Sequence, residues 1–364
     1  MSLIYNIALT LVRSVGDVTA KKLLDHFSTS EAVFKARKRE LMEIQGIGEA
    51  IASEILNHKA ALEAAEKQLA FIKKHKIQVF FYTDENYPRR LKNCNDAPVI
   101  LYYRGTADLN HPRIISIVGT RRATEYGRKL CRELVETLVP YDVIIVSGMA
   151  YGIDVASHKE SLALNIPTIG VMAHGLDRIY PPLHQPIAQK MVLNGGLLTE
   201  FLPGTVPDKE NFPKRNRIIA GIADATIVVE ATARGGALIT ADIANSYNRD
   251  VYAYPGRTSD QYSEGCNFLI KTNRAALIAH ARDLIYYLGW EETLPEKADS
   301  QLQMAIDLST EEHKIVGLLK DTTLAVDEIS ARSGLSQSRL AMQLLSLEMK
   351  GIVIALPGKM YKLN

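Results

Sequence analysis

The sequence predicts an α/β protein built on a doubly wound parallel sheet, with a small all-α domain before the sheet and a winged-helix domain after it. Three observations predict this order. Apolar residues recur at three- and four-residue spacings early in the chain, six short apolar runs then alternate with helical stretches, and three helical stretches with two short strands follow. With 364 residues, 47% of them hydrophobic, the chain is long enough for two or three cores.

Residues 1–75 are predicted to form the all-α domain, of helix-hairpin-helix (SAM-like) type. Residues 44–48 (Ile-Gln-Gly-Ile-Gly) have the Gly-hydrophobic-Gly pattern of such a hairpin, and residues 15–18 look like a copy that lacks the second glycine. These hairpins can aim backbone N–H groups at a DNA phosphate, because glycine permits close approach and a helix N-terminus favours an anion. A tight turn without a ligand is the alternative. This alternative is favoured for residues 15–18, whereas for residues 44–48 the two interpretations are equally well supported.

Residues 76–290 are predicted to form an extended Rossmann-like domain. Two extended segments, residues 77–82 and 99–103, come first. Each later apolar run ends in a glycine-rich or polar turn before a helical stretch, which is typical of parallel strands joined by helices. These runs are residues 114–118, 143–146, 168–172, 196–198, 226–229 and 251–253.

A further apolar stretch lies late in the sheet domain. Residues 276–278, with Leu284 and Ile285, are expected to be helical and buried in the domain's own core. A two-fold dimer contact is the alternative.

Residues 291–307 are predicted to be a polar linker, and residues 308–364 a winged-helix domain. Helical stretches at residues 310–319, 326–333 and 336–349 precede short strands at residues 352–355 and 360–363. The third helix carries only Arg339 and Lys350 as cations. A protein-binding or packing role for this domain is therefore at least as well supported as DNA reading.

The charge balance excludes a polycation. The chain has 43 Lys and Arg against 41 Asp and Glu, a formal net charge of +2, so any nucleic-acid binding must be local. Cys94, Cys131 and Cys266 show no CxxC spacing, which argues against disulfides and a zinc site. The sequence shows no secretory signal and no apolar run of bilayer length, so a cytoplasmic protein without membrane contact, metal or cofactor is expected.

Function is expected at the turns after the strands, because ligands of doubly wound sheets bind beyond the carboxyl ends of the strands. Glycines there let phosphates approach, hydroxyls and helix N-termini donate hydrogen bonds, and arginines add charge-assisted contacts. Phe212 adds an aromatic face for base stacking, worth roughly 1–3 kcal/mol per base, with core packing as an equal alternative. The predicted DNA-binding residues are Gly119, Thr120, Arg121, Arg122, Ser147, Gly148, Phe212, Lys214, Arg215, Asn216, Arg217, Gly235 and Gly236.

Several of these turns resemble the signature of the DNA-processing protein A family, known as DprA or Smf. The matching segments are residues 116–121 (SIVGTR), 146–154 (VSGMAYGID), 212–219 (FPKRNRII), 237–241 (ALITA) and 254–256 (YPG). The resemblance covers about residues 80–284, and the two end domains fit the family more loosely.

The resemblance implies a homodimer that coats single-stranded DNA during natural transformation and loads the recombinase RecA onto it, without catalysis of its own. Binding of double-stranded DNA would be weaker. Carried over by position, the strand-binding pocket comprises Gly119, Thr120, Arg121, Phe212, Lys214, Arg215, Asn216 and Arg217. Two departures from the family pattern each put one contact in doubt. Many relatives have a lysine shortly after the Tyr-Pro, where this chain has residues 182–184 (Pro-Leu-His), and Gly236 stands where relatives often have serine.

A nucleotide-cleaving enzyme is the alternative. Enzymes that activate cytokinins carry a Pro-Gly-Gly-x-Gly-Thr-x-x-Glu motif on a related fold, and residues 234–236 (Arg-Gly-Gly) align with its start. Asp242 would replace the catalytic glutamate, but Leu238 and Ile239 replace the glycine and threonine of the phosphate turn. The chain shows no GxGxxG after a strand, no Walker A motif and no GxSxG elbow.

Polar residues near the strand ends have structural alternatives to catalysis. Asp154 is expected to cap a helix, and Glu200 and Glu230 to orient cationic side chains. His158 and His174 lack partners at metal-ligand spacing, so solvent-facing or loop-packing positions are expected.

Overall fold

The structure, a computed structural model, describes residues 2–290, 308–320, 322–356 and 360–363. The chain divides into two compact units, Met1–Leu294 and Pro295–Asn364. The predicted linker, residues 291–307, lies outside the described residues. Within the described part of the chain, no helix is both long and apolar enough to cross a membrane.

Short helices form the N-terminal part of the first unit, as the apolar spacing predicts. Gly16 and Gly48 are the N-cap residues of α2 and α5, and Gly46 has a φ of +93°, so the chain turns sharply at both predicted hairpins. The apolar faces of the helices share one core with β1 and β2. The helices are α1 (Ser2–Leu11), α2 (Asp17–Phe27), α3 (Ser30–Lys35), α4 (Lys38–Met42), α5 (Glu49–Leu56) and α6 (Lys59–Lys74).

The rest of the first unit is built on a nine-stranded sheet in the order β1-β2-β6-β5-β4-β3-β7-β8-β9. From β6 to β9 in this order, neighbouring strands are parallel, whereas β2 pairs antiparallel with both β6 and β1. The predicted parallel sheet is confirmed, with two antiparallel strands added at one edge. The strands are β1 (Gln78–Phe81), β2 (Ile100–Gly105), β3 (Ile114–Val118), β4 (Ile144–Ser147), β5 (Thr168–Val171), β6 (Gly195–Thr199), β7 (Ala225–Val228), β8 (Asp250–Ala253) and β9 (Ala276–Leu277).

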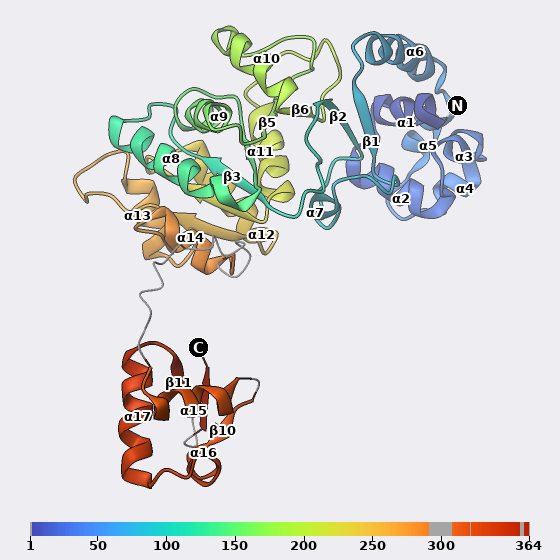
Figure 1. Ribbon diagram of the computed structural model, residues 1–364. Helices are drawn as coiled ribbons and strands as arrows, with labels where there is room; N and C mark the ends of the chain where they lie inside the picture. Colours follow the sequence, from blue (N-terminus) through green and yellow to red (C-terminus); the bar gives the residue numbers. More distant parts are fainter. Residues whose placement is uncertain (1, 291–307, 321, 357–359, 364) are drawn as a thin grey trace. The chain divides into compact units, whose positions relative to one another are not determined.

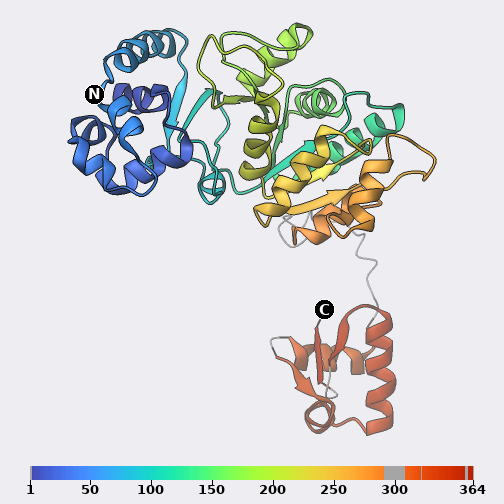
Figure 2. The ribbon, with the colours of Figure 1, turned by 180° about the vertical axis from the view of Figure 1, so that it is seen from behind.

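Helices cover both faces of the sheet (Figures 1 and 2). Alternate residues of β3 face opposite cores: Ile115 and Ile117 pack with α8 and α14, and Ile114 and Val118 pack with α11, α12 and α13. The helices are α7 (Arg89–Lys92), α8 (Glu125–Leu138), α9 (Ile153–Ala163), α10 (Gln185–Leu193), α11 (Asn211–Ile222), α12 (Gly236–Ser246), α13 (Glu264–Lys271) and α14 (Ala281–Tyr287), with 3-10 turns at Val139–Tyr141 and Pro182–His184.

The helical prediction for residues 276–278 is wrong in part. Ala276 and Leu277 form β9, which pairs with β8, because tertiary pairing decides the conformation of so short an apolar run. Ile278, Leu284 and Ile285 are buried in the unit's own core, as the favoured interpretation had it.

The second unit has the expected winged-helix order. Its strands form a sheet in the order β10-β12-β11, and its core includes Ile315, Ile329, Leu340 and Leu344. The elements are α15 (Thr310–Leu319), β10 (Leu324–Ala325), α16 (Val326–Ser333), α17 (Gln337–Met349), β11 (Val353–Leu356) and β12 (Met360–Leu363).

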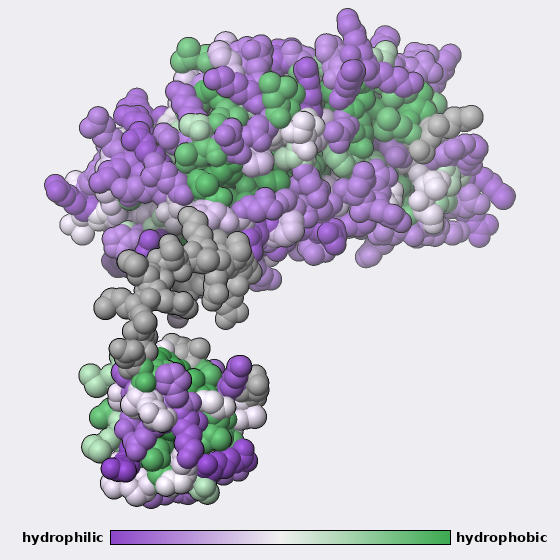
Figure 3. Space-filling view, in the orientation of Figure 1, coloured by the Kyte–Doolittle hydropathy of each residue, from purple (hydrophilic) through white to green (hydrophobic). Residues whose placement is uncertain are grey.

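Helix α17 presents an apolar stripe rather than a cationic one. Met342, Leu345 and Met349 are 59–83% exposed, and apolar side chains gather over this helix in the space-filling view (Figure 3). Lys350 donates hydrogen bonds to both carboxylate oxygens of Glu312 at 2.7 and 2.9 Å, and Arg339 lies 3.6 Å from Glu311. Arg339 and Lys350, the two cations of this helix that were candidates for DNA contact, are thus paired with acidic side chains of α15.

Glycine is required where the turns after β3 and β4 meet. Gly152 has a φ of +79°, and a Cβ atom there would overlap the carbonyl oxygen of Thr120. The same carbonyl accepts a hydrogen bond from the N–H of Ile153 at 3.1 Å, at the start of α9. The two turns can therefore approach this closely only without a side chain at position 152.

We predict that Gly152→Ala destabilises the first unit by about 2 kcal/mol or more, because the new Cβ meets both an unfavourable φ and a backbone oxygen. The matched control is Gly236→Ala, since no atom lies within 4 Å of a Cβ built at Gly236. Urea unfolding of both variants measures the difference. Equal stability of the two variants would contradict the tight-turn account.

Candidate nucleic-acid interface

Two adjoining pockets lie beyond the carboxyl ends of the parallel strands. The β4–β5 pocket, about 420 Å³, includes Met149, His174 and Tyr180 in its lining; the β3–β7 pocket, about 580 Å³, includes the turns at residues 119–122 and 235–237. Both pockets share Arg121, Ala150, Lys209, Phe212 and Arg215. We call the two together the edge pockets.

The β3–β7 pocket is suited to an anion. Arg121, Arg122 and Lys209 are exposed there, and among the described residues no carboxylate lies within salt-bridge distance of them. Helix α12 points its N-terminus at the pocket, with Gly235 as N-cap and no acidic residue in its first turn. Unpaired N–H groups at such a helix start attract phosphate oxygens.

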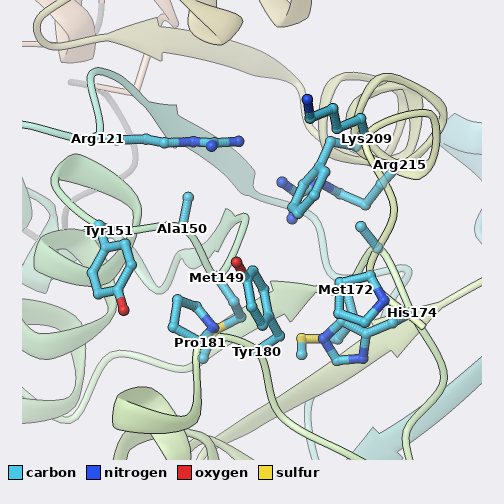
Figure 4. A pocket seen from close by; sticks show the side chains of 13 residues that line it. Arg121, Met149, Ala150, Tyr151, Met172, His174, Tyr180, Pro181, Lys209 and Arg215 are labelled. Atoms are coloured by element: carbon cyan, nitrogen blue, oxygen red, sulfur yellow. The ribbon is translucent and has the colours of Figure 1, made fainter.

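The β4–β5 pocket adds aromatic surface (Figure 4). The rings of Tyr180 and Phe212 lie 6.5 Å apart at 56°, and the Arg121 guanidinium lies 5.3 Å from the centre of the Phe212 ring. Phe212 is half-buried and belongs to none of the core clusters of the described chain, so pocket lining replaces core packing as its role. The arrangement pairs flat rings with cations, as single-strand binding requires.

The structure brings most predicted site residues together. Those that line the edge pockets are Gly119, Thr120, Arg121, Arg122, Phe212, Arg215, Asn216, Gly235 and Gly236. Lys214 is exposed on α11 outside the pocket lining. Sequence reasoning missed Lys209, Tyr151 and the pocket-facing role of His174 and Tyr180. Lys209 stands two residues before Asn211, so it extends the run of cations at the start of α11, and this position in the sequence could have revealed it.

Ser147 and Gly148 lie beneath the pockets. The Ser147 hydroxyl donates to the Ile117 carbonyl at 2.6 Å and is fully buried. A Cβ at Gly148 would overlap Asp154 and the Arg215 guanidinium, so the glycine makes room for these two charged groups. Ser147 and Gly148 thus line neither edge pocket and lie next to residues that do.

Arg215 and Asp154 are buried charged groups in the lining of the β3–β7 pocket. Burial lowers the pKa of Arg215 to about 10, against the effect of the Asp154 carboxylate. Burial likewise raises the pKa of Asp154, with Arg215 acting in the opposite direction. Asp154 lies in the first turn of α9 and accepts a hydrogen bond from the Ala150 N–H at 3.3 Å, so it ties the preceding turn to the helix rather than acting as its N-cap.

Arg217 has a structural position. Its guanidinium donates to Glu200, to Asp17 of α2 at 2.9 Å, and to the Asp96 carbonyl, and it is not among the residues that line the edge pockets. Asp17 also accepts from the Val99 N–H at 2.9 Å. The hairpin at residues 15–18 thus packs against the sheet domain through Asp17.

The acids near the strand ends are bonded to neighbouring groups of the protein. Glu230 accepts hydrogen bonds from the Thr124 N–H at 3.0 Å and from its hydroxyl at 2.5 Å, so the expectation that Glu230 orients a cation is wrong. Glu200 does orient one, Arg217. Asp242, the residue on which the enzyme alternative depends, pairs with Arg274 and lines neither edge pocket.

The two histidines and three cysteines considered in the sequence are all buried. His158 and His174 are buried, so the solvent-facing alternative is wrong for both. Cys94, Cys131 and Cys266 are free and buried. No group of three or more His, Cys, Asp or Glu side chains in the described residues could hold a metal ion.

Comparison with protein families gives three matches along the chain. The family "DNA recombination-mediator protein A" matches residues 78–289, the "DprA winged helix domain" matches residues 299–359, and a "helix-hairpin-helix motif" matches residues 7–64. The first match alone spans more than half of the chain.

Individual proteins agree. Protein Smf from Synechocystis sp. is 32% identical over 98% of both chains, and Protein Smf from Escherichia coli is 32% identical over 83% of this chain and 82% of its own. The crystal structure of DNA processing protein A from Streptococcus pneumoniae superposes with a TM-score of 0.69 at 31% identity, over 78% of this chain and 97% of that chain. DNA processing protein A from Helicobacter pylori, a structure described by its single-stranded DNA binding mode, gives 0.54 at 29% identity over 59% and 96%.

We predict that Glu200→Gln removes a pH dependence of stability. Burial raises the pKa of Glu200 to about 7, although Arg217 acts in the opposite direction. The folded chain therefore holds a proton that the unfolded chain releases at lower pH, so this stabilisation is present in acid and is lost as the pH rises from about 4.5 to 7. Urea unfolding from pH 5 to 8 should show the natural protein losing on the order of 2 kcal/mol more than the variant.

The exposed Glu85 offers the control, since Glu85→Gln removes a carboxylate from the surface. That variant should follow the natural protein. Parallel pH curves for the natural protein and Glu200→Gln would show that Glu200 does not titrate in this range.

Proposed function

Because the chain belongs to the DNA recombination-mediator protein A family, also called DprA or Smf, we propose that it binds single-stranded DNA at the edge pockets and loads RecA onto the bound strand. The setting would be natural transformation and recombination. The single-stranded DNA binding named for the Helicobacter pylori relative supports the first half of this proposal.

The observation that carries the proposal is the position of Phe212 between cations. Arg121 and Arg215 lie 5.3 and 6.0 Å from the centre of its ring, and the N-terminus of α12 opens on the adjoining pocket. A base that stacks at Phe212 thereby brings its phosphates near Arg121, Arg122 and Gly235. A base paired in a duplex does not offer its face in this way, so the site favours the single strand.

The proposal includes no catalytic reaction. The carboxylates near the edge pockets are buried beside arginines or bonded to backbone, and Asp242 is paired outside them. The alternative, a nucleotide-cleaving enzyme, requires Asp242 to reach a bound nucleotide. Incubation of the protein with nucleoside monophosphates should therefore release no free base, as measured by chromatography; release that Asp242→Ala abolishes would restore the enzyme alternative.

A homodimer is part of the proposal. Leu277 of the edge strand β9 is 43% exposed, and Tyr286 and Tyr287 of α14 are 68% and 51% exposed. Tyr287 stacks on Tyr252 with ring centres 5.5 Å apart, which gives this side of the sheet an aromatic surface. An edge strand with an aromatic border is suited to a two-fold contact.

We predict that Arg121→Ala weakens binding of labelled oligo-dT and lowers the slope of log K against log salt by about 0.7, the amount expected for one lost single-strand phosphate contact. Fluorescence anisotropy across a salt series, with a matched duplex as comparison, measures both quantities. The natural protein should prefer the single strand.

Arg128→Ala is the matched control, because Arg128 is exposed on α8 and lies outside both edge pockets. It should leave the slope unchanged. An unchanged slope for Arg121→Ala, or equal losses for both variants, would remove Arg121 from the binding site.

A further inference from the structure

A third cavity lies at the carboxyl end of β8, outside both edge pockets. Its volume is about 600 Å³, and it is lined by Tyr126 of α8 and by residues 255–257 and Asp260 of the loop between β8 and α13. We call this cavity the β8 groove. The loop projects beyond the sheet beside α8 (Figures 1 and 2). None of the residues assigned so far to strand binding lines the groove.

The β8 groove and the β3–β7 pocket are lined by the same two segments of chain. The loop after β8 lines the groove through Asp260 and the pocket through Gln261 and Tyr262. On the other side, Arg122 lines the pocket and Tyr126 lines the groove. Four residues of chain span at most about 14 Å. A strand that occupies the pocket can therefore enter the groove within a few nucleotides.

The loop that forms one wall of the groove is held by its own hydrogen bonds. The Asn267 side chain of α13 donates to the Gly256 carbonyl at 3.0 Å and accepts from the Gly256 N–H at 3.1 Å. The Asp260 N–H donates to the Arg257 carbonyl at 3.1 Å, which closes a turn over residues 257–260. Because the wall is formed without a ligand, little ordering entropy opposes binding there.

The side chains of the groove combine an aromatic ring with a free cation. Tyr126 is 49% exposed, and Arg257 is exposed with no carboxylate within salt-bridge distance in the described part of the chain. The Asp260 carboxylate accepts hydrogen bonds from the Tyr262 N–H at 3.3 Å and from the Ser263 hydroxyl at 3.2 Å, so it is engaged by its own loop. An exposed ring with a guanidinium in the same groove suits a base and its phosphate.

We propose that a strand bound at the edge pockets continues into the β8 groove, where one base stacks on Tyr126 and Arg257 binds a phosphate. This inference rests on the proposed single-strand binding and adds a second contact region to it. Stacking and phosphate contacts tolerate every base, so the groove lengthens the binding site without adding a sequence preference. The contribution of the groove should therefore depend on the length of the strand.

The test measures fluorescence anisotropy of the full chain with labelled oligo-dT, from the shortest strand that binds measurably to about 16 nucleotides, the upper range of site sizes in single-strand-binding folds. Arg257→Ala should leave the shortest strand unaffected. For longer strands it should lower the slope of log K against log salt by about 0.7, as expected for one lost phosphate contact. Tyr126→Ala should weaken only the longer strands, by about fivefold or more for one lost stacking contact.

Two matched variants serve as controls. Tyr126→Phe keeps the ring and should bind like the natural protein at every length. Arg128→Ala removes an exposed cation of α8 that lines neither the groove nor the edge pockets, so it should leave the slope unchanged. Thermal unfolding shows whether each variant is folded, and Arg257→Ala carries the test if Tyr126→Ala is not.

If the natural protein binds no oligo-dT at all, the proposed function fails. If it binds, but Arg257→Ala and Tyr126→Ala match it at every length or lose the same factor at every length, single-strand binding stands and the β8 groove is overturned as a second contact region.

Discussion

Helix α11 carries the buried Arg215 and the partly buried Arg217, and the partners of these two side chains fix the place of the helix over the carboxyl edge of the sheet. Arg215 donates to the Val171 carbonyl at the end of β5, and Arg217 joins Glu200 at the end of β6 to Asp17 of the helical domain. Removing a partner from such a buried pair leaves an uncompensated charge, so the position of the helix is strongly specified. Phe212, at the start of the same helix, is thereby held in the edge pockets.

The sequence could predict the sheet, because each parallel strand is an apolar run followed by a glycine-rich or polar turn, and these turns meet at one edge. It could not tell which cations of the segment 214–217 face a ligand. Arg215 and Arg217 look equivalent in the sequence, yet only Arg215 lines the pockets. Arg217 is instead bonded to Asp17 of α2 and to Glu200, directly after β6. The β8 groove depends on the fold that brings α8 to the loop after β8, and no spacing in the chain could reveal it.

The charge distribution explains how a chain with a net charge of +2 can have a local polyanion site. Its cations are divided between two uses. Arg90, Arg217 and Lys350 are bonded to carboxylates and hold elements together, whereas Arg121, Arg122 and Lys209 are exposed at the edge pockets. In the winged-helix unit, too, cations such as Lys350 are bonded to carboxylates. The exposed side chains of Met342, Leu345 and Met349 favour contact with a protein over contact with DNA.

Photo-crosslinking of the full chain to oligo-dT that carries a single 4-thiothymine tests the central claim most directly, because it reports where the strand lies without any substitution in the protein. Peptide mapping by mass spectrometry should locate the crosslinks in the segments that contain Tyr151, Tyr180 and Phe212, which line the β4–β5 pocket. Crosslinks confined to the helices before β1 or to the winged-helix unit would contradict the account and move the single-strand site away from the sheet.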